Sequence, residues 1–151
     1  MPDRDETEEP LQSLPLGMAR RYAEYKPASA RHSTRVTNVG GYDELLEFCR
    51  EKGTFLPRTR QGLAEVDSLI DKTGDRTTLE ALVRPIGMFF GDVLTHTIPG
   101  AEWKIIHEGL PEVKIVGNMS VSVIHVARNR LNLGVPTLVM NYDHALDLID
   151  R

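Results

Sequence analysis

The stretch IGMFFGDVLTHTIPGAEWKII, residues 86–106, decides most of the fold. Its first half places large apolar residues at helical spacings of three and four, so we expect a helix over about residues 86–97 with one apolar face. A Pro-Gly turn and a strand through Trp103 follow. Gly87 and Gly91 lie four residues apart and leave a smooth helix face, where a neighbouring backbone can approach closely. We predict that the ring of Trp103, the only tryptophan, occupies that face.

Length and composition fit one ordinary globular domain. The chain has 151 residues, of which 40% are hydrophobic and 26% are charged. A formal charge of -4 argues mildly against a dedicated nucleic-acid binder. Cys49 is the only cysteine, so no internal disulfide can form. The start of the sequence has no apolar run behind basic residues, and no stretch is long enough to span a membrane, so we expect a cytoplasmic protein that does not enter a membrane.

Residues 1–35 differ in composition from the rest of the chain. Residues 1–9 contain five acidic residues and one basic residue, whereas residues 20–35 contain five basic residues and one acidic residue. Prolines are frequent and large apolar side chains are sparse, so we predict a mobile charged arm before a single globular domain of residues 36–151. The basic residues could contact nucleic acid or an acidic partner, or the arm could be a solvated tail whose halves partly neutralise each other. These basic residues are Arg20, Arg21, Lys26, Arg31 and Arg35.

The remaining pattern predicts a helix-rich front, a small antiparallel sheet and a helical tail. The expected elements are helices at about 42–52, 59–72, 77–84 and 86–97, a hairpin at about 102–116, a short strand at 119–121, and helices around Leu131 and from Pro136 to Ile149. Residues 77–97 form either one helix kinked at Pro85 or two helices. The fold class is therefore α+β, with helices packed on two or three antiparallel strands.

Candidate catalytic and metal-binding residues are scattered along the sequence. Cys49 could act as a nucleophile, but its place on an apolar helix stripe is typical of an inert thiol. Three polar groupings have helical spacing: Asp92 with His96, His125 with Asn129, and His144 with Asp147 beside Asp143. Exposed helix faces account for all three, and no recognised metal motif is present, so we predict no metal site and no cofactor.

Two further groups could bind anions. Gly40 and Gly41 stand at a helix start and offer free backbone amides, although no Walker-type lysine follows them. A polar stretch after the sheet predicts either a basic patch for phosphate or an acidic partner, or a solvated helix face. Its members are Arg128, Asn129, Arg130 and Asn132. The carboxylates of Glu65 and Asp67 are expected on different, solvated faces.

Residues 87–93, GMFFGDV, and 97–103, TIPGAEW, resemble a small family of uncharacterised bacterial domains, chiefly actinobacterial. Members of that family show a Gly-apolar-Leu-Gly helix, a Pro-Gly turn and a strand that bears a tryptophan. Phe90 stands where the family pattern has Leu, a change that keeps the position apolar. The resemblance covers about residues 60–131 and implies a fold without an assigned activity.

Three functions from different classes are open. The first is a non-enzymatic binding or regulatory module that presents its sheet or helical tail to a protein partner. The second is an enzyme whose pocket combines residues distant in sequence, among them Cys49, His96, His125 and His144. The third is a nucleic-acid binder that uses the basic arm. We rank them in this order, because an apolar framework without an acid, base or ligand cluster is typical of a binding module. Catalytic and binding residues stay unassigned.

Overall fold

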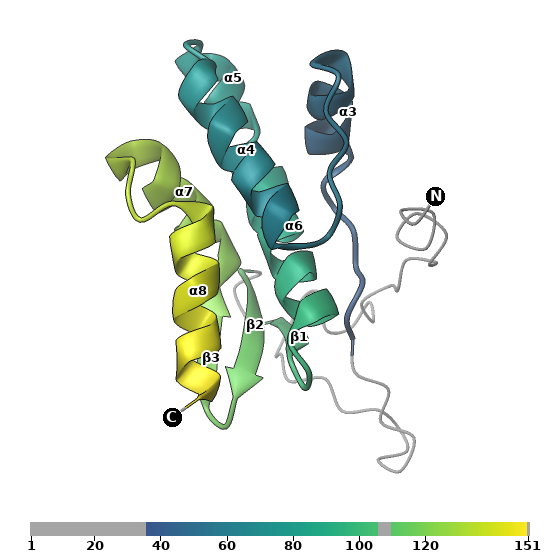
Figure 1. The fold of residues 1–151 in the computed structure, drawn as a ribbon, viewed down its shortest axis with the longest axis vertical. Helices are drawn as coiled ribbons and strands as arrows, with labels where there is room; N and C mark the ends of the chain where they lie inside the picture. Colours follow the sequence, from purple (N-terminus) through teal and green to yellow (C-terminus); the bar gives the residue numbers. More distant parts are fainter. Residues whose placement is uncertain (1–35, 106–109, 151) are drawn as a thin grey trace.

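A computed structural model describes residues 36–105 and 110–150. In chain order the elements are α3 (Asp43–Glu51), α4 (Arg60–Lys72), α5 (Arg76–Ala81), α6 (Val83–Thr97), β1 (Glu102–Ile105), β2 (Pro111–Val116), β3 (Met119–Ser122), α7 (Val123–Leu133) and α8 (Leu138–Ile149) (Figure 1). The strands form one antiparallel sheet in the order β1-β2-β3. The predicted α+β class is therefore confirmed. The predicted arm of residues 1–35 lies outside the described residues.

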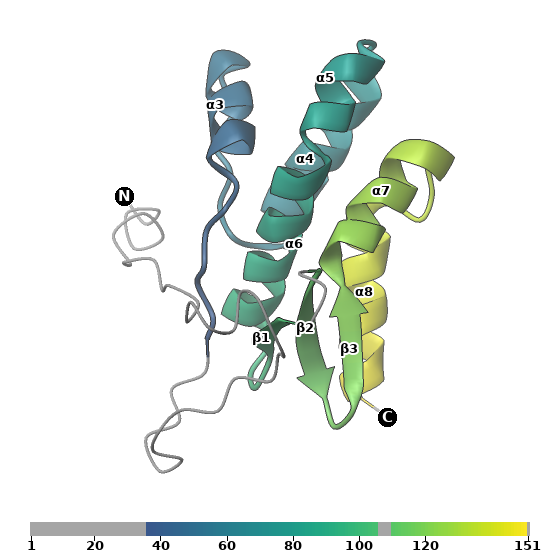
Figure 2. The same ribbon diagram turned by 180° about the vertical axis from the view of Figure 1, so that it is seen from behind.

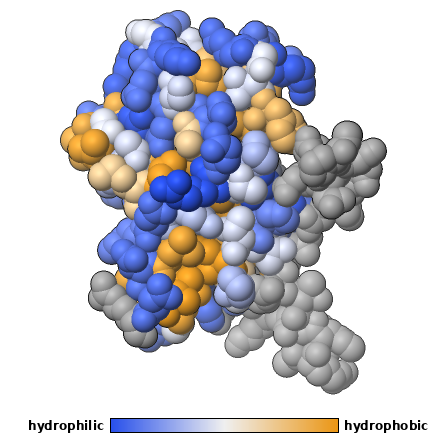
Figure 3. All heavy atoms as spheres, viewed as in Figure 1, coloured by the Kyte–Doolittle hydropathy of each residue, from blue (hydrophilic) through white to orange (hydrophobic). Residues whose placement is uncertain are grey.

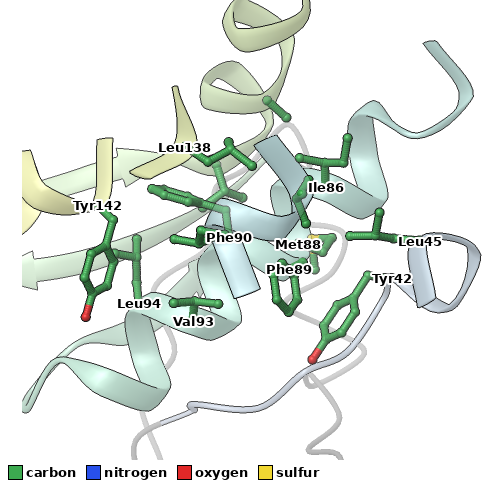
Figure 4. Close-up of a cluster of buried hydrophobic side chains, with 14 of the residues drawn as sticks. Tyr42, Leu45, Ile86, Met88, Phe89, Phe90, Val93, Leu94, Leu138 and Tyr142 are labelled. Carbon is green, nitrogen blue, oxygen red and sulfur yellow. The ribbon is translucent and has the colours of Figure 1, made fainter. Parts of the chain in front are cut away.

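Helix α6 is the centre of the fold. Every residue from Val83 to Thr95 is buried except Arg84, because α3, α4, α5, α7 and the sheet all contact this helix (Figure 2). Its large side chains contact residues from both ends of the described chain: Figure 4 shows them between Tyr42 and Leu45 on one side and Leu138 and Tyr142 on the other. The apolar periodicity of residues 86–97 thus predicts the helix but understates how completely it is buried.

The packing of Trp103 against α6 confirms the central prediction. A side chain at Gly91 would overlap the six-membered ring of Trp103, which is itself buried. Gly87 has a different neighbour, since a Cβ atom added there would lie 2.8 Å from the carbonyl oxygen of Val123, the first residue of α7. The two glycines therefore allow two elements, β1 and α7, to approach the backbone of α6 at different places.

Residues 77–97 form two helices. Helix α5 ends at Ala81 and α6 begins at Val83, so the break lies at Leu82 and the central helix begins before the predicted residue 86. Pro85 lies in the first turn of α6, where its missing N–H group has no intrahelical partner to lose. The proline is therefore compatible with the start of the central helix and does not kink it.

The sheet buries one face and exposes charged side chains on the other. Val113 of β2 lies in the core, whereas its neighbours Glu112 and Lys114 are half-buried on the opposite face. Lys114 stands opposite Glu102 of β1, with 3.7 Å between its Nζ and Oε2 of Glu102, and Glu112 stands opposite Lys104. Opposite charges in register stabilise the strand pairing by roughly 0.2–1 kcal/mol for each pair.

Candidate functional site

Asp92 of α6 is a fully buried carboxylate that holds three segments together. Its Oδ1 accepts hydrogen bonds from Trp103 Nε1 at 2.8 Å and from the amide of Val39 at 3.2 Å, and its Oδ2 accepts one from the amide of Gly40 at 3.1 Å. Burial raises the pKa of Asp92, because the charged form loses its hydration. The hydrogen bonds from Trp103, Val39, Gly40 and the Tyr42 side chain oppose that rise.

This arrangement changes two interpretations of the sequence. The amide of Gly40 does bind an anion, as its position suggests, but the anion is the carboxylate of Asp92. Positive φ angles of 70° at Gly40 and 91° at Gly41 carry the backbone around this contact. The prediction that Asp92 lies on an exposed face beside His96 is wrong, because Asp92 points inward to Trp103 while His96 is exposed.

A second buried polar group joins α4, α7 and α8. The guanidinium of Arg130 donates to Oδ1 of Asp67 at 2.7 Å and to Oδ1 of Asp71 at 3.0 Å. Asp67 also accepts hydrogen bonds from the amides of Leu138, at 3.0 Å, and Val139, at 3.1 Å, which begin α8. A buried charge is tolerated when it is paired and hydrogen-bonded in this way. One carboxylate therefore fixes the positions of two helices.

These contacts correct the predictions for two residues. Asp67 is not solvated and Arg130 is not part of an exposed basic patch, since both are buried in the ion pair. A sequence signal for Asp67 exists, because it lies four residues after Leu63 and three before Ile70, on the apolar face of α4. Arg128 does lie at the surface, 3.8 Å from a carboxylate oxygen of Glu80.

The connection between α7 and α8 exposes apolar side chains while both of its ends are fixed. We call residues 133–140, from the last residue of α7 into the first turn of α8, the apolar loop. Leu133 is 67% exposed, Val135 59% and Met140 52%, and Figure 3 shows an apolar area at this edge of the molecule. Arg130 of α7 precedes this segment and Leu138 is the first residue of α8, and both bind Asp67. The loop therefore presents large apolar groups from a fixed base.

The candidate catalytic residues lie apart. Cys49 is buried, and burial together with the charge of Glu65 raises the pKa of its thiol to about 11, which disfavours the nucleophilic thiolate. His96, His125 and His144 are exposed on three different helices. In the part of the chain that the structure describes, no group of three or more His, Cys, Asp and Glu side chains could hold a metal ion.

Comparison with known proteins gives one match. Residues 18–148 match the model of a family described as a family of unknown function (DUF6278). The match extends beyond residues 60–131, which carry the resemblance in the sequence, and it includes the basic residues of 20–35. No curated protein and no solved structure matches the chain. Among the described residues, no helix has the length and apolar character that crossing a membrane requires.

Proposed function

Since this chain belongs to that family of unknown function, we propose its function from the surface it presents: it is a non-enzymatic binding module whose apolar loop contacts a protein partner. The observation that carries the proposal is the exposure of Leu133 and Val135, the two most exposed large hydrophobic residues among those described. Exposed apolar groups gathered in one segment are typical of protein-protein contacts.

The energetics of the apolar loop support this role. Burial of the exposed parts of Leu133 and Val135 in an interface would contribute roughly 1–2 kcal/mol each. The ion pair of Asp67 and Arg130 fixes the base of the loop, so less conformational freedom is lost on binding than for a flexible segment. The loop thus combines apolar area with preorganisation.

Protein capture tests the proposal. The full chain and its Leu133→Glu/Val135→Glu variant serve as baits in an extract of the native host, and the captured proteins are identified by mass spectrometry. Phe55→Glu/Val116→Glu is the matched control, because it makes the same charge change at exposed apolar positions elsewhere. We expect a partner that the parent and the control retain and the loop variant loses. The same proteins captured by all three baits would refute the role of the loop.

The other two functions gain less support. A nucleophilic Cys49 is disfavoured by its burial and raised pKa, and the basic arm of the nucleic-acid hypothesis lies outside the described residues. The proposal also places the module in the bacterial cytoplasm. The free and buried thiol of Cys49 is consistent with a reducing compartment.

A further inference from the structure

The last turns of α8 extend past the beginning of α4 and carry a surface of their own. The two helices run antiparallel, and Arg60, the first residue of α4, donates two hydrogen bonds of 3.0 and 2.9 Å to Asp143, midway along α8. Beyond Asp143, α4 does not accompany α8. Leu146 and Ile149 follow Tyr142 at spacings of four and seven on the inner face of α8, yet they are 36% and 37% exposed. Figure 3 shows an apolar area beside this half of α8.

This end of α8 is also negatively charged. Asp147 and Asp150 are exposed, and neither carboxylate forms an ion pair with another described residue. The last turn of α8 contains no basic residue. The helix dipole adds negative potential at a C-terminus, which favours a cation there. We call Leu146, Asp147, Ile149 and Asp150 the α8 tail surface, which combines apolar area with two carboxylates that form no ion pair with another described residue.

We propose that residues 18–35 of this same chain bind the α8 tail surface. Residues 20–35 contain five basic residues and one acidic residue, which complements the carboxylates of Asp147 and Asp150, neither of which pairs with a cation among the described residues. Two tyrosines interleave with these basic residues, and their rings supply apolar area for Leu146 and Ile149. The contact neutralises the tail of α8 and covers apolar area that α4 leaves open.

The point of attachment permits this contact. The carbonyl oxygen of Val36 accepts a hydrogen bond of 2.9 Å from the amide of Trp103, so the preceding segment joins the body at β1. In Figures 1 and 2, β1 and the C-terminal half of α8 lie at the same end of the molecule. Eighteen extended residues reach roughly 60 Å, several times the radius of gyration of about 13 Å expected for such a domain.

The family match favours a segment of this chain over a separate partner. The match begins at residue 18, just before the basic stretch, and ends at residue 148, within the tail of α8. The acidic residues 1–9 lie outside it. The basic segment and the first two residues of the α8 tail surface, Leu146 and Asp147, thus belong to the unit that the family shares, whereas Ile149 and Asp150 follow it directly. The covalent link also gives the segment a high effective concentration at the α8 tail surface.

Paramagnetic NMR on the full chain tests the contact. A spin label is attached at Ser29→Cys, and Cys49 does not compete for the reagent because it is buried. We expect the label to weaken the amide signals of residues 146–150. Asp147→Lys/Asp150→Lys should restore these signals, because the surface then repels a segment with five basic residues and one acidic residue. Glu44→Lys/Glu51→Lys makes the same charge change on α3 and should leave the parent pattern intact.

Three results would overturn the proposal. Unaltered signals of residues 146–150 in the labelled parent would show that the segment does not reach the α8 tail surface. Weakening in a mixture of labelled molecules with unlabelled, isotope-enriched molecules would identify a second copy as the occupant. Equal recovery of the amide signals of residues 146–150 in Glu44→Lys/Glu51→Lys would show that the segment is attracted by the net negative charge of the domain and not by the α8 tail surface.

Discussion

The contact between Gly91 and Trp103 can be tested by adding a single methyl group. In an unconstrained helix, Gly→Ala raises stability by roughly 0.5–1 kcal/mol. At Gly91 the new Cβ would lie 2.5 Å from Cζ2 of Trp103, closer than real Cβ atoms come. The indole cannot move away freely, since it is buried and its Nε1 donates to Asp92 at 2.8 Å. Overpacking costs about 1–3 kcal/mol, so we expect Gly91→Ala to lower the free energy of unfolding by roughly 1–2 kcal/mol.

The same substitution in the Trp103→Ala background is the matched control. Removal of the ring should itself cost roughly 3–5 kcal/mol. It also leaves space for the methyl group, so Gly91→Ala should then be neutral or stabilise by up to about 1 kcal/mol. The two backgrounds should therefore differ by roughly 2 kcal/mol. Urea unfolding followed by far-ultraviolet circular dichroism measures all four proteins, because it does not depend on tryptophan fluorescence.

Equal effects of Gly91→Ala in the two backgrounds would refute the contact. A stabilising effect in the parent would refute it as well, because it would show that the added methyl group meets open space. Gly91→Leu should be more destabilising than Gly91→Ala, since its longer side chain enters the same space. A native emission maximum typical of water-exposed tryptophan would contradict the burial of Trp103 on which the prediction depends.

Four further predictions concern Asp92, Arg130 and Cys49, which are all buried. Asp92→Ala leaves two buried N–H donors, of Gly40 and Trp103, and the half-buried amide of Val39 without their acceptor, and it should cost roughly 3–5 kcal/mol in urea unfolding. The folded-state pKa of Asp92 is raised from 3.8, so its contribution to the free energy of unfolding is greatest below pH 3.8 and is lost as pH rises through the folded-state pKa. Over this pH range the free energy of unfolding of the parent should fall relative to that of Asp92→Asn. Arg130→Met leaves the buried charge of Asp67 unpaired and should cost about 3–5 kcal/mol. Arg60→Met, at an exposed ion pair, should lower the free energy of unfolding far less, and similar losses for the two variants would contradict the assigned burial. The thiol of Cys49 should react with a thiol reagent only after denaturation, and rapid reaction in the native protein would contradict its burial and its pKa of about 11.

Local patterns in the sequence predict the elements of this fold well. Helical spacing of apolar residues predicts α6, and alternation predicts the hairpin of β1 and β2, because both are properties of a few consecutive side chains. Two glycines four residues apart predict that a neighbouring element approaches the backbone of α6 closely. The single tryptophan identifies β1 as one such element. The helical tail is also expected as α8, although the exposure of Leu146 at its end is not.

Only the tertiary structure decides which polar residues are buried and which apolar residues are exposed. Asp92 receives two of its three donors from residues 52 and 53 positions away, and Asp67 binds Arg130 across 63 positions. A carboxylate on a helix has the same local pattern whether water or distant N–H groups solvate it, so periodicity does not distinguish the two states. The exposure of Leu133 and Val135 depends in the same way on which distant elements pack nearby. The sequence by itself therefore determined the helices and strands, whereas long-range packing determined the buried charges and the candidate binding surfaces.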